Sequence, residues 1–399
     1  MLRRYALLTL TALTGLAAGA SGASATLSTV RVGIADQSAS MFTASRYLAL
    51  DLKRTRYFIK WNAIHDPALL AQADAFVDAA RAHDVDVLMH ISTDNFTPGE
   101  GTLPSRTRYR RDVGALVARY YPKGVREWGV WNEANDRTQP TQRSPSRAAD
   151  FFVEMWRLLD NSNRCGSRVT GKCRIVALDI LDGKTKKDQG NARSYIRRFY
   201  SRLSSTYDRR ASIIGIHNYT DTNRRGRSGT KNVITEAKKG NRRANFWLTE
   251  TGGIVKLGST GDFTCSTTST ASQKRAESHA NRAVSWMFKL AKDYRRDVDR
   301  LYVYQWTGSD CARDVRFDAG LTRRDGSAAG PEHGLAPAAG VVDPEAVGGA
   351  ARFRSPRSLA ATESGDQGRV VAGKLRLLLA VRRIRPRVAQ SHRRGSSPG

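Results

Sequence analysis

Eight short apolar runs, each separated from the next by a more polar segment, place the strongest constraint on the fold of this chain. The runs are rich in Val, Ile, Leu and aromatic residues, with little strict alternation of apolar and polar side chains. Such runs are typical of strands buried on both faces, as in a parallel sheet covered by helices. They occupy residues 29–35, 56–61, 85–92, 127–133, 174–181, 212–219, 245–252 and 300–306.

The segments between these runs repeat apolar residues at helical spacing, which predicts a helix before almost every later strand. Eight βα units within roughly 280 residues favour a (β/α)8 barrel, the TIM barrel architecture. A doubly wound open sheet is the main alternative, but no glycine-rich dinucleotide fingerprint follows the first run. The expected helices occupy residues 45–52, 68–83, 110–121, 146–162, 192–203, 231–239 and 272–294.

The first 25 residues predict a signal peptide. Arg3 and Arg4 precede an apolar run that is short for a membrane span, and residues 23–25 read Ala-Ser-Ala, a small-residue cleavage site. An uncleaved anchor is the alternative. We therefore expect a secreted or envelope-associated protein with no transmembrane segment in its mature part.

The composition changes after Asp325. Residues 26–325 form the expected barrel domain, whereas residues 326–399 are rich in Ala, Gly, Pro and Arg and show no helical or strand periodicity. This composition predicts a disordered basic tail. Residues 373–387 alternatively form a short basic apolar stretch that could lie on an anionic surface.

Four cysteines become informative in an exported protein, because disulfides persist outside the cytosol. Cys165 and Cys173 lie close together on either side of a glycine-containing turn. This pairing leaves Cys265 with Cys311, both in loops that follow the last two expected strands. A metal site would require His or Cys at tighter spacing, so the sequence predicts two disulfides, no metal and no cofactor.

The net charge of +29, from 66 Lys and Arg against 37 Asp and Glu, raises the question of an anionic partner. An acidic polysaccharide, a cell-wall polymer or nucleic acid would each suit this charge. The alternative is an ordinary solvated basic surface, which we favour because the basic residues are scattered. No nucleic-acid motif accompanies them, so we expect no nucleic-acid partner.

Polar side chains stand at the C-terminal ends of the expected strands, where a barrel carries its active site. Two of them are glutamates, Glu133 at the end of the fourth expected strand and Glu250 at the end of the seventh. Cleavage of a glycosidic bond requires such a pair: an acid protonates the departing oxygen, while a second carboxylate meets the charge that develops at the anomeric carbon. Structural ion pairing of both glutamates is the alternative.

Four motifs together carry a family resemblance. The segments WNEAN, HNY, WLTETG and YQW, at the ends of the fourth, sixth, seventh and eighth expected strands, resemble glycoside hydrolase clan A barrels over about residues 29–320. Family 39-like bacterial glycosidases are the most similar. The resemblance implies that Glu133 is the acid/base and Glu250 the nucleophile. It implies that substrate is bound by Asn132, Arg56, His90, His217, Tyr219 and Trp306.

The sequence therefore predicts a secreted, monomeric, retaining glycoside hydrolase that cleaves β-glycosidic bonds of a polysaccharide or oligosaccharide by double displacement. A non-catalytic barrel that binds carbohydrate or another anionic polymer is the alternative. The alternative for Arg56 is a charge paired inside the barrel. The alternative for His90 is a hydrogen-bonded core histidine. One departure from the clan is visible, because no helix is evident after the eighth strand.

Overall fold

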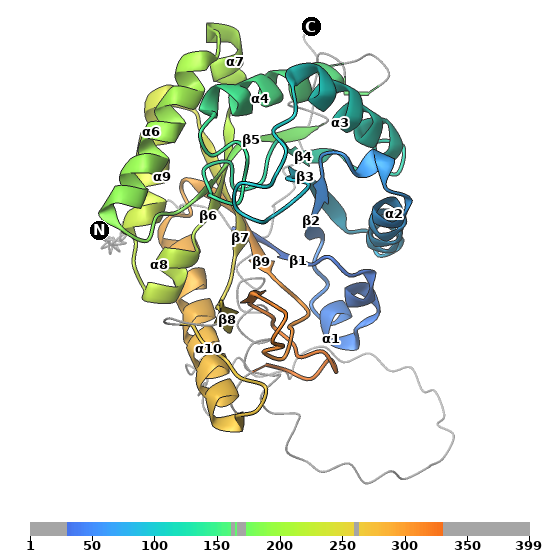
Figure 1. The fold of residues 1–399 in the computed structure, drawn as a ribbon, viewed down its shortest axis with the longest axis vertical. Coiled ribbons are helices and arrows are strands. Elements are labelled where there is room, and N and C mark those ends of the chain that lie inside the picture. The colour runs from blue at the N-terminus through green and yellow to red at the C-terminus, as the bar shows by residue number, and fades with distance from the viewer. Residues whose placement is uncertain (1–29, 161–163, 166–172, 259–262, 330–399) are drawn as a thin grey trace, which may run out of the picture. The chain divides into compact units, whose positions relative to one another are not determined.

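Eight parallel strands form a closed barrel in the computed structural model, with helices packed around its outside (Figure 1). The structure describes residues 30–160, 164–165, 173–258 and 263–329. The expected signal peptide and all but the first four residues of the expected tail lie outside this part of the chain. The barrel confirms the expected (β/α)8 fold and excludes the open-sheet alternative.

The barrel strands follow one another in chain order, and β9 closes the ring against β1. Five residue pairs, from Arg31 with Arg300 to Ala35 with Tyr304, join these two strands in parallel. The strands are β1 (Arg31–Ala35), β2 (Arg54–Lys60), β3 (Asp86–Ser92), β4 (Glu127–Gly129), β5 (Arg174–Leu181), β6 (Ile213–His217), β7 (Asn245–Thr251) and β9 (Val298–Tyr304).

Several helices begin where a side chain satisfies free backbone N–H groups of the first turn. Asp66 accepts hydrogen bonds from the N–H groups of Ala68 and Leu69 at the start of α2, and Thr185 with Asp188 forms a capping box on α6. The helices are α1 (Ser45–Leu48), α2 (Pro67–Ala82), α3 (Arg106–Tyr120), α4 (Pro145–Leu159), α6 (Lys186–Arg202), α7 (Ser205–Arg210), α8 (Tyr219–Arg224), α9 (Ser228–Gly240) and α10 (Thr270–Asp293), with short 3-10 turns at Ala39–Thr43 and Ala63–His65.

Two expected strands are shorter than their apolar runs. The run at 127–133 was expected to be extended throughout, but β4 ends at Gly129 and Glu133 has a positive φ of 43°. The run at 212–219 likewise ends at His217, and Tyr219 begins α8. In both places the chain leaves the sheet before the candidate site residue, so Glu133 is presented from a turn and Tyr219 from the first position of a helix.

The core has two layers because each strand is covered on both faces. Leu88, Val176, Trp247 and Tyr302 fill the barrel interior. A larger cluster fills the space between strands and helices. Burial on both faces explains why the strands read as continuous apolar runs.

A two-stranded antiparallel sheet outside the barrel was not expected from the sequence. It joins β8 (Lys256–Leu257) to β10 (Phe317–Asp318), and the Cys265–Cys311 disulfide links the same loops. Cys165 and Cys173 form the other disulfide, so the expected pairing of all four cysteines is confirmed. No helix follows β9 within the part of the chain that the structure describes.

In the same part of the chain, no helix combines the length and apolar character that a membrane crossing requires.

Candidate active site

Backbone hydrogen bonds to two neighbouring strands hold the turn that carries Glu133. The N–H of Asn132 donates to the carbonyl of Ile91 on β3 at 2.7 Å, and the N–H of Ala134 donates to the carbonyl of Asp179 on β5 at 2.9 Å. Because its neighbours on both sides are bonded in this way, Glu133 has little freedom of position. Its side chain is 18% exposed and can be reached from solvent.

Arg56 on β2 lies beneath the mouth and holds Glu250 on β7. Its guanidinium is fully buried and donates to Oε2 of Glu250 at 2.7 Å and to Oδ1 of Asn132 at 2.5 Å. Burial alone would lower the pKa of Arg56, but the charges of Glu250 and Asp179 raise it, so the guanidinium is held in its charged form. The Tyr219 hydroxyl donates to the other oxygen of Glu250 at 3.0 Å.

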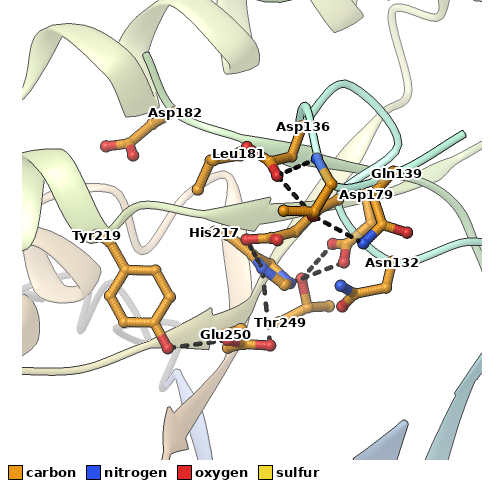
Figure 2. Close-up of polar contacts among 12 residues, drawn as sticks. Asn132, Asp136, Gln139, Asp179, Leu181, Asp182, His217, Tyr219, Thr249 and Glu250 are labelled. Atoms are coloured by element: carbon orange, nitrogen blue, oxygen red, sulfur yellow. Dashed lines mark hydrogen bonds and ion pairs between the residues drawn. The ribbon is translucent and has the colours of Figure 1, made fainter. Parts of the chain in front are cut away.

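His217, at the end of β6, connects the two glutamates. Its Nδ1 lies 3.0 Å from Oε1 of Glu133. The same nitrogen lies 3.7 Å from Oε2 of Glu250 (Figure 2). The two carboxylate oxygens therefore lie no farther apart than these distances laid end to end, which keeps them under about 7 Å. The ~5–5.5 Å separation of the two carboxyl groups in retaining glycosidases lies within this limit.

Asp179 on β5 completes this cluster, and no prediction from the sequence included it. Its carboxylate is fully buried, with Oδ2 2.7 Å from Nε2 of His217 and 3.5 Å from Nε2 of His90. Thr249 donates a hydrogen bond to Oδ1, as Figure 2 shows. The available signal was an acidic residue inside the apolar run RIVALDIL, since a buried carboxylate requires a partner.

The two histidines of the cluster differ in charge. Burial alone would lower the pKa of His217, but Asp179 and Glu250 raise it to about 10, so this imidazole is a cation near neutral pH. Burial lowers the pKa of His90 to about 3, and this imidazole is neutral. Nδ1 of His90 accepts from Nε of Arg56 at 3.2 Å, which leaves its proton on Nε2, facing Asp179.

The pKa values of Glu133 and Asp179 are shifted in opposite directions by their surroundings. Burial raises the pKa of Glu133, and the charge of Glu250 adds to this effect while His217 opposes it. Burial would also raise the pKa of Asp179, but His217, His90 and Arg56 hold it well below its usual range. Glu133 therefore has the environment of a proton donor, and Asp179 that of a permanent anion.

Gly129 and Gly215 make room for these side chains. A Cβ on Gly215 would lie 1.8 Å from Oδ1 of Asp179, and one on Gly129 would lie 2.2 Å from the His90 ring. Neither position can carry a larger residue without moving the cluster.

Seven of the eight residues proposed from the sequence as catalytic or substrate-binding meet in this cluster: Arg56, His90, Asn132, Glu133, His217, Tyr219 and Glu250. The eighth, Trp306, is 5% exposed and packs edge-on against Tyr47, with ring centroids 5.6 Å apart. His90 is fully buried beneath the site, where its contacts are with Arg56 and Asp179. The described residues contain no group of three or more His, Cys, Asp or Glu arranged to hold a metal ion.

Comparison with known proteins relates the chain to others through its fold alone. No protein-family model matches the sequence, and no curated protein matches it. Solved structures do match: a fungal β-1,4-galactanase has a TM-score of 0.53 at 14% identity and covers 75% of this chain and 97% of its own.

Two xylanases are similar to the chain at the same level. The xylanase from Paenibacillus barcinonensis, solved with a conduramine derivative, has a TM-score of 0.51 at 12% identity and covers 76% of this chain and 95% of its own. A family 10 endoxylanase from a sugarcane soil metagenome has a TM-score of 0.50 at 13% identity, with 75% and 94% covered. The chain therefore shares the barrel fold of these glycoside hydrolases.

Proposed function

We propose that this protein is a retaining glycoside hydrolase that cleaves β-glycosidic bonds in a polysaccharide or oligosaccharide. The observation that carries the proposal is the position of His217, which touches Glu133 and Glu250 through the same nitrogen. Two carboxylates at this separation, Glu133 partly exposed and Glu250 held by Arg56, suit double displacement at a single sugar.

In the first step of this reaction Glu250 attacks the anomeric carbon while Glu133 protonates the departing oxygen. In the second step Glu133 takes a proton from water, and the water releases the sugar from Glu250. Arg56 and Tyr219 hold Glu250 in position for attack. The amide oxygen of Asn132 accepts from Arg56, so its NH2 group remains to donate to a sugar hydroxyl.

The test is hydrolysis of nitrophenyl β-glycosides, β-1,4-xylan and β-1,4-galactan by the wild type, Glu250→Gln and Glu133→Gln. We expect Glu250→Gln to lose activity on every substrate. Glu133→Gln retains more activity on nitrophenyl glycosides than on polysaccharides, because a good leaving group needs little protonation. Glu236→Gln on α9, a buried glutamate paired with Arg197, is the matched control and keeps full activity. Equal activity of all four proteins contradicts the proposal.

Export and family membership belong to this proposal as well. The signal-peptide pattern of residues 1–25 supports secretion, and N-terminal sequencing of protein recovered outside the cell is the measurement. The narrower likeness to family 39 rests on the sequence motifs.

A second candidate, a barrel that binds an anionic polymer, is favoured by the charge of one face. Helices α6 and α9 pack together and carry nine Lys and Arg between them against only two acidic residues, Asp188 and Glu236. Within this set Arg197 and Lys239 are paired with Glu236, as Arg119 and Lys123 next to α2 are paired with Asp74 and Asp78. Salt-dependent binding of heparin or DNA without hydrolysis of any glycoside would support this candidate.

A further inference from the structure

The aromatic surface beside the catalytic pair comes from residues that the sequence motifs did not indicate. Trp306, the aromatic residue expected there, is turned against Tyr47 and is almost fully buried. Tyr304, two residues earlier on β9, is partly exposed. Alternate residues of a strand share a face, so Tyr304 points the same way as Tyr302, which lies in the barrel interior.

Phe317 on β10 extends this surface over the catalytic mouth. Its ring centroid lies 5.3 Å from that of Tyr219, edge to face, and 6.1 Å from that of Tyr304, with the planes tilted by 30°. The hydroxyl of Tyr219 bonds to Glu250. The rings of Tyr219, Tyr304 and Phe317, which we call the aromatic wall, are therefore contiguous and begin at the nucleophile candidate.

The small sheet outside the barrel holds Phe317 in this position. Phe317 pairs with Leu257, which is 47% exposed, and directly paired residues share a face of a sheet. The neighbouring Asp318 is buried and accepts hydrogen bonds from the N–H and hydroxyl of Ser309 and from the N–H of Gly320, at 2.7–2.9 Å.

A buried lysine and a disulfide fix the same loop to the barrel. Nζ of Lys256 donates to the carbonyl oxygens of Cys311 and Ala312, and Cys311 is bonded to Cys265. These interactions immobilise a segment that the eight-stranded barrel does not require for closure. Together they fix the position of the partly exposed ring of Phe317.

We propose that the aromatic wall is a sugar-binding subsite, on which the C–H face of the pyranose unit next to Glu250 packs, and that Cys265–Cys311 holds the wall in place. A flat apolar ring suits a sugar because C–H groups gather on one face while hydroxyls point outward to water. This inference rests on the proposed glycosidase function and adds the part of the site that selects the substrate.

The test compares two substitutions at the exposed ring. Phe317→Leu keeps apolar bulk and loses the flat face, whereas Phe317→Tyr keeps the flat face. The probes are β-1,4-linked xylo- and galacto-oligosaccharides, bound to the Glu250→Gln form and hydrolysed by the active form. We expect Phe317→Leu to weaken binding and raise KM by about two- to tenfold, with Phe317→Tyr within twofold of wild type.

Matched controls separate binding from folding. Tyr121→Leu removes a partly exposed aromatic residue shortly before β4, at the end of the barrel away from Glu133, and leaves binding unchanged. Thermal unfolding shows that each variant is folded. The Cys265→Ser/Cys311→Ser form should weaken binding as well, and adding Phe317→Leu to it should have less than the additive effect.

The outcomes distinguish this proposal from the proposed function. Weaker binding in Phe317→Leu, in a protein that hydrolyses no probe, supports the aromatic wall while the hydrolase proposal fails. Intact hydrolysis with an unchanged KM in Phe317→Leu overturns the wall alone. Binding that is unaffected in the Cys-to-Ser form overturns the role of the disulfide, and no binding of any probe overturns the subsite.

Discussion

Nε2 of His217 lies 2.7 Å from Oδ2 of Asp179, with both side chains fully buried beneath the mouth of the barrel. This contact sets the charge of the imidazole, whose other nitrogen touches Glu133. Through His217, the buried anion on β5 thereby influences the proton donor proposed on the turn after β4. The two residues are 38 positions apart in sequence, and the barrel brings their strands side by side.

The first prediction concerns the charge of His217. In Asp179→Asn the imidazole loses the nearest of its anionic neighbours, so its pKa falls below the value of about 10 in the wild type. We expect kcat/KM to fall by at least about tenfold at neutral pH, because an uncharged imidazole no longer orients Glu133 in the same way. Nitrogen NMR of the histidine side chains across pH 5–11 (roughly, the span set by the shift) measures the titration directly.

Stability provides the control for this variant. Asp179→Asn removes one of the anions that face the buried cations Arg56 and His217 and should lower the free energy of unfolding by about 3–5 kcal/mol. Thr249→Val removes only the hydroxyl that donates to Asp179, and a loss of about 1.5–3 kcal/mol is expected. Urea unfolding of both proteins provides the comparison, and an unchanged His217 titration in Asp179→Asn would refute the electrostatic coupling.

The second prediction is a dependence of stability on pH. The pKa of His217 is raised from 6.5 to about 10 on folding. Its contribution to stability is therefore complete below about pH 6.5 and is lost as the pH rises through 10. His90 acts in the opposite direction, because its pKa falls to about 3 on folding. The folded protein therefore loses stability as the pH falls below 6.5, where the unfolded chain binds a proton at His90 that the folded protein does not.

Chemical unfolding at a series of pH values measures the loss of stability at both high and low pH. Between pH 7 and 10 the wild type should lose stability by up to about 1.4 kcal/mol per pH unit more steeply than His217→Gln. His217→Gln lacks the titrating group, so it reports the contribution of every other residue. Parallel curves for the two proteins would contradict the raised pKa.

A third prediction uses the space left by glycine. Gly215→Ala would place a Cβ 1.8 Å from Oδ1 of Asp179 and 2.6 Å from Oγ1 of Thr249. We expect it to lower the free energy of unfolding by about 1–3 kcal/mol or more, because overpacking displaces the buried cluster. Gly190→Ala within α6 has nothing within 4 Å of the new methyl group and should raise stability by up to about 1 kcal/mol. Thermal denaturation distinguishes the two.

A fourth prediction compares the disulfides. Cys265–Cys311 closes a segment of 46 residues, and Cys165–Cys173 closes one of 8. On the chain-entropy model, replacing the first pair by serine should lower the free energy of unfolding by about 4 kcal/mol and the second by about 2.5 kcal/mol. Guanidinium unfolding of the two double variants measures both values, and the reverse order would show that native packing outweighs loop closure.

The barrel was predictable because its information is local and repeated. Each strand lies within a short run of apolar residues, and each long helix repeats its apolar residues at helical spacing. Chain order then determines neighbours, since parallel strands joined by helices pair in sequence. The small sheet of β8 and β10 was missed because its strands have two residues each and leave no periodic signal.

The two glutamates could be paired from the sequence because their ranks in the barrel imply a common mouth. The ends of β4 and β6 could not be placed in the same way. Glu133 sits in a turn with positive φ, which the apolar run WGVW does not indicate. Backbone bonds to β3 and β5, formed only in the closed barrel, set this conformation.

By itself, the sequence determined the fold class, the cysteine pairing and the residue types gathered at the mouth, because strand rank and periodicity are properties of the chain. Tertiary structure alone decided which groups carry charge and which aromatic rings are exposed. Asp179 makes His217 a cation, while Tyr47 buries Trp306 and leaves Tyr304 and Phe317 at the surface. Burial and charge depend on distances between strands remote in sequence, so these properties arise only when the barrel closes.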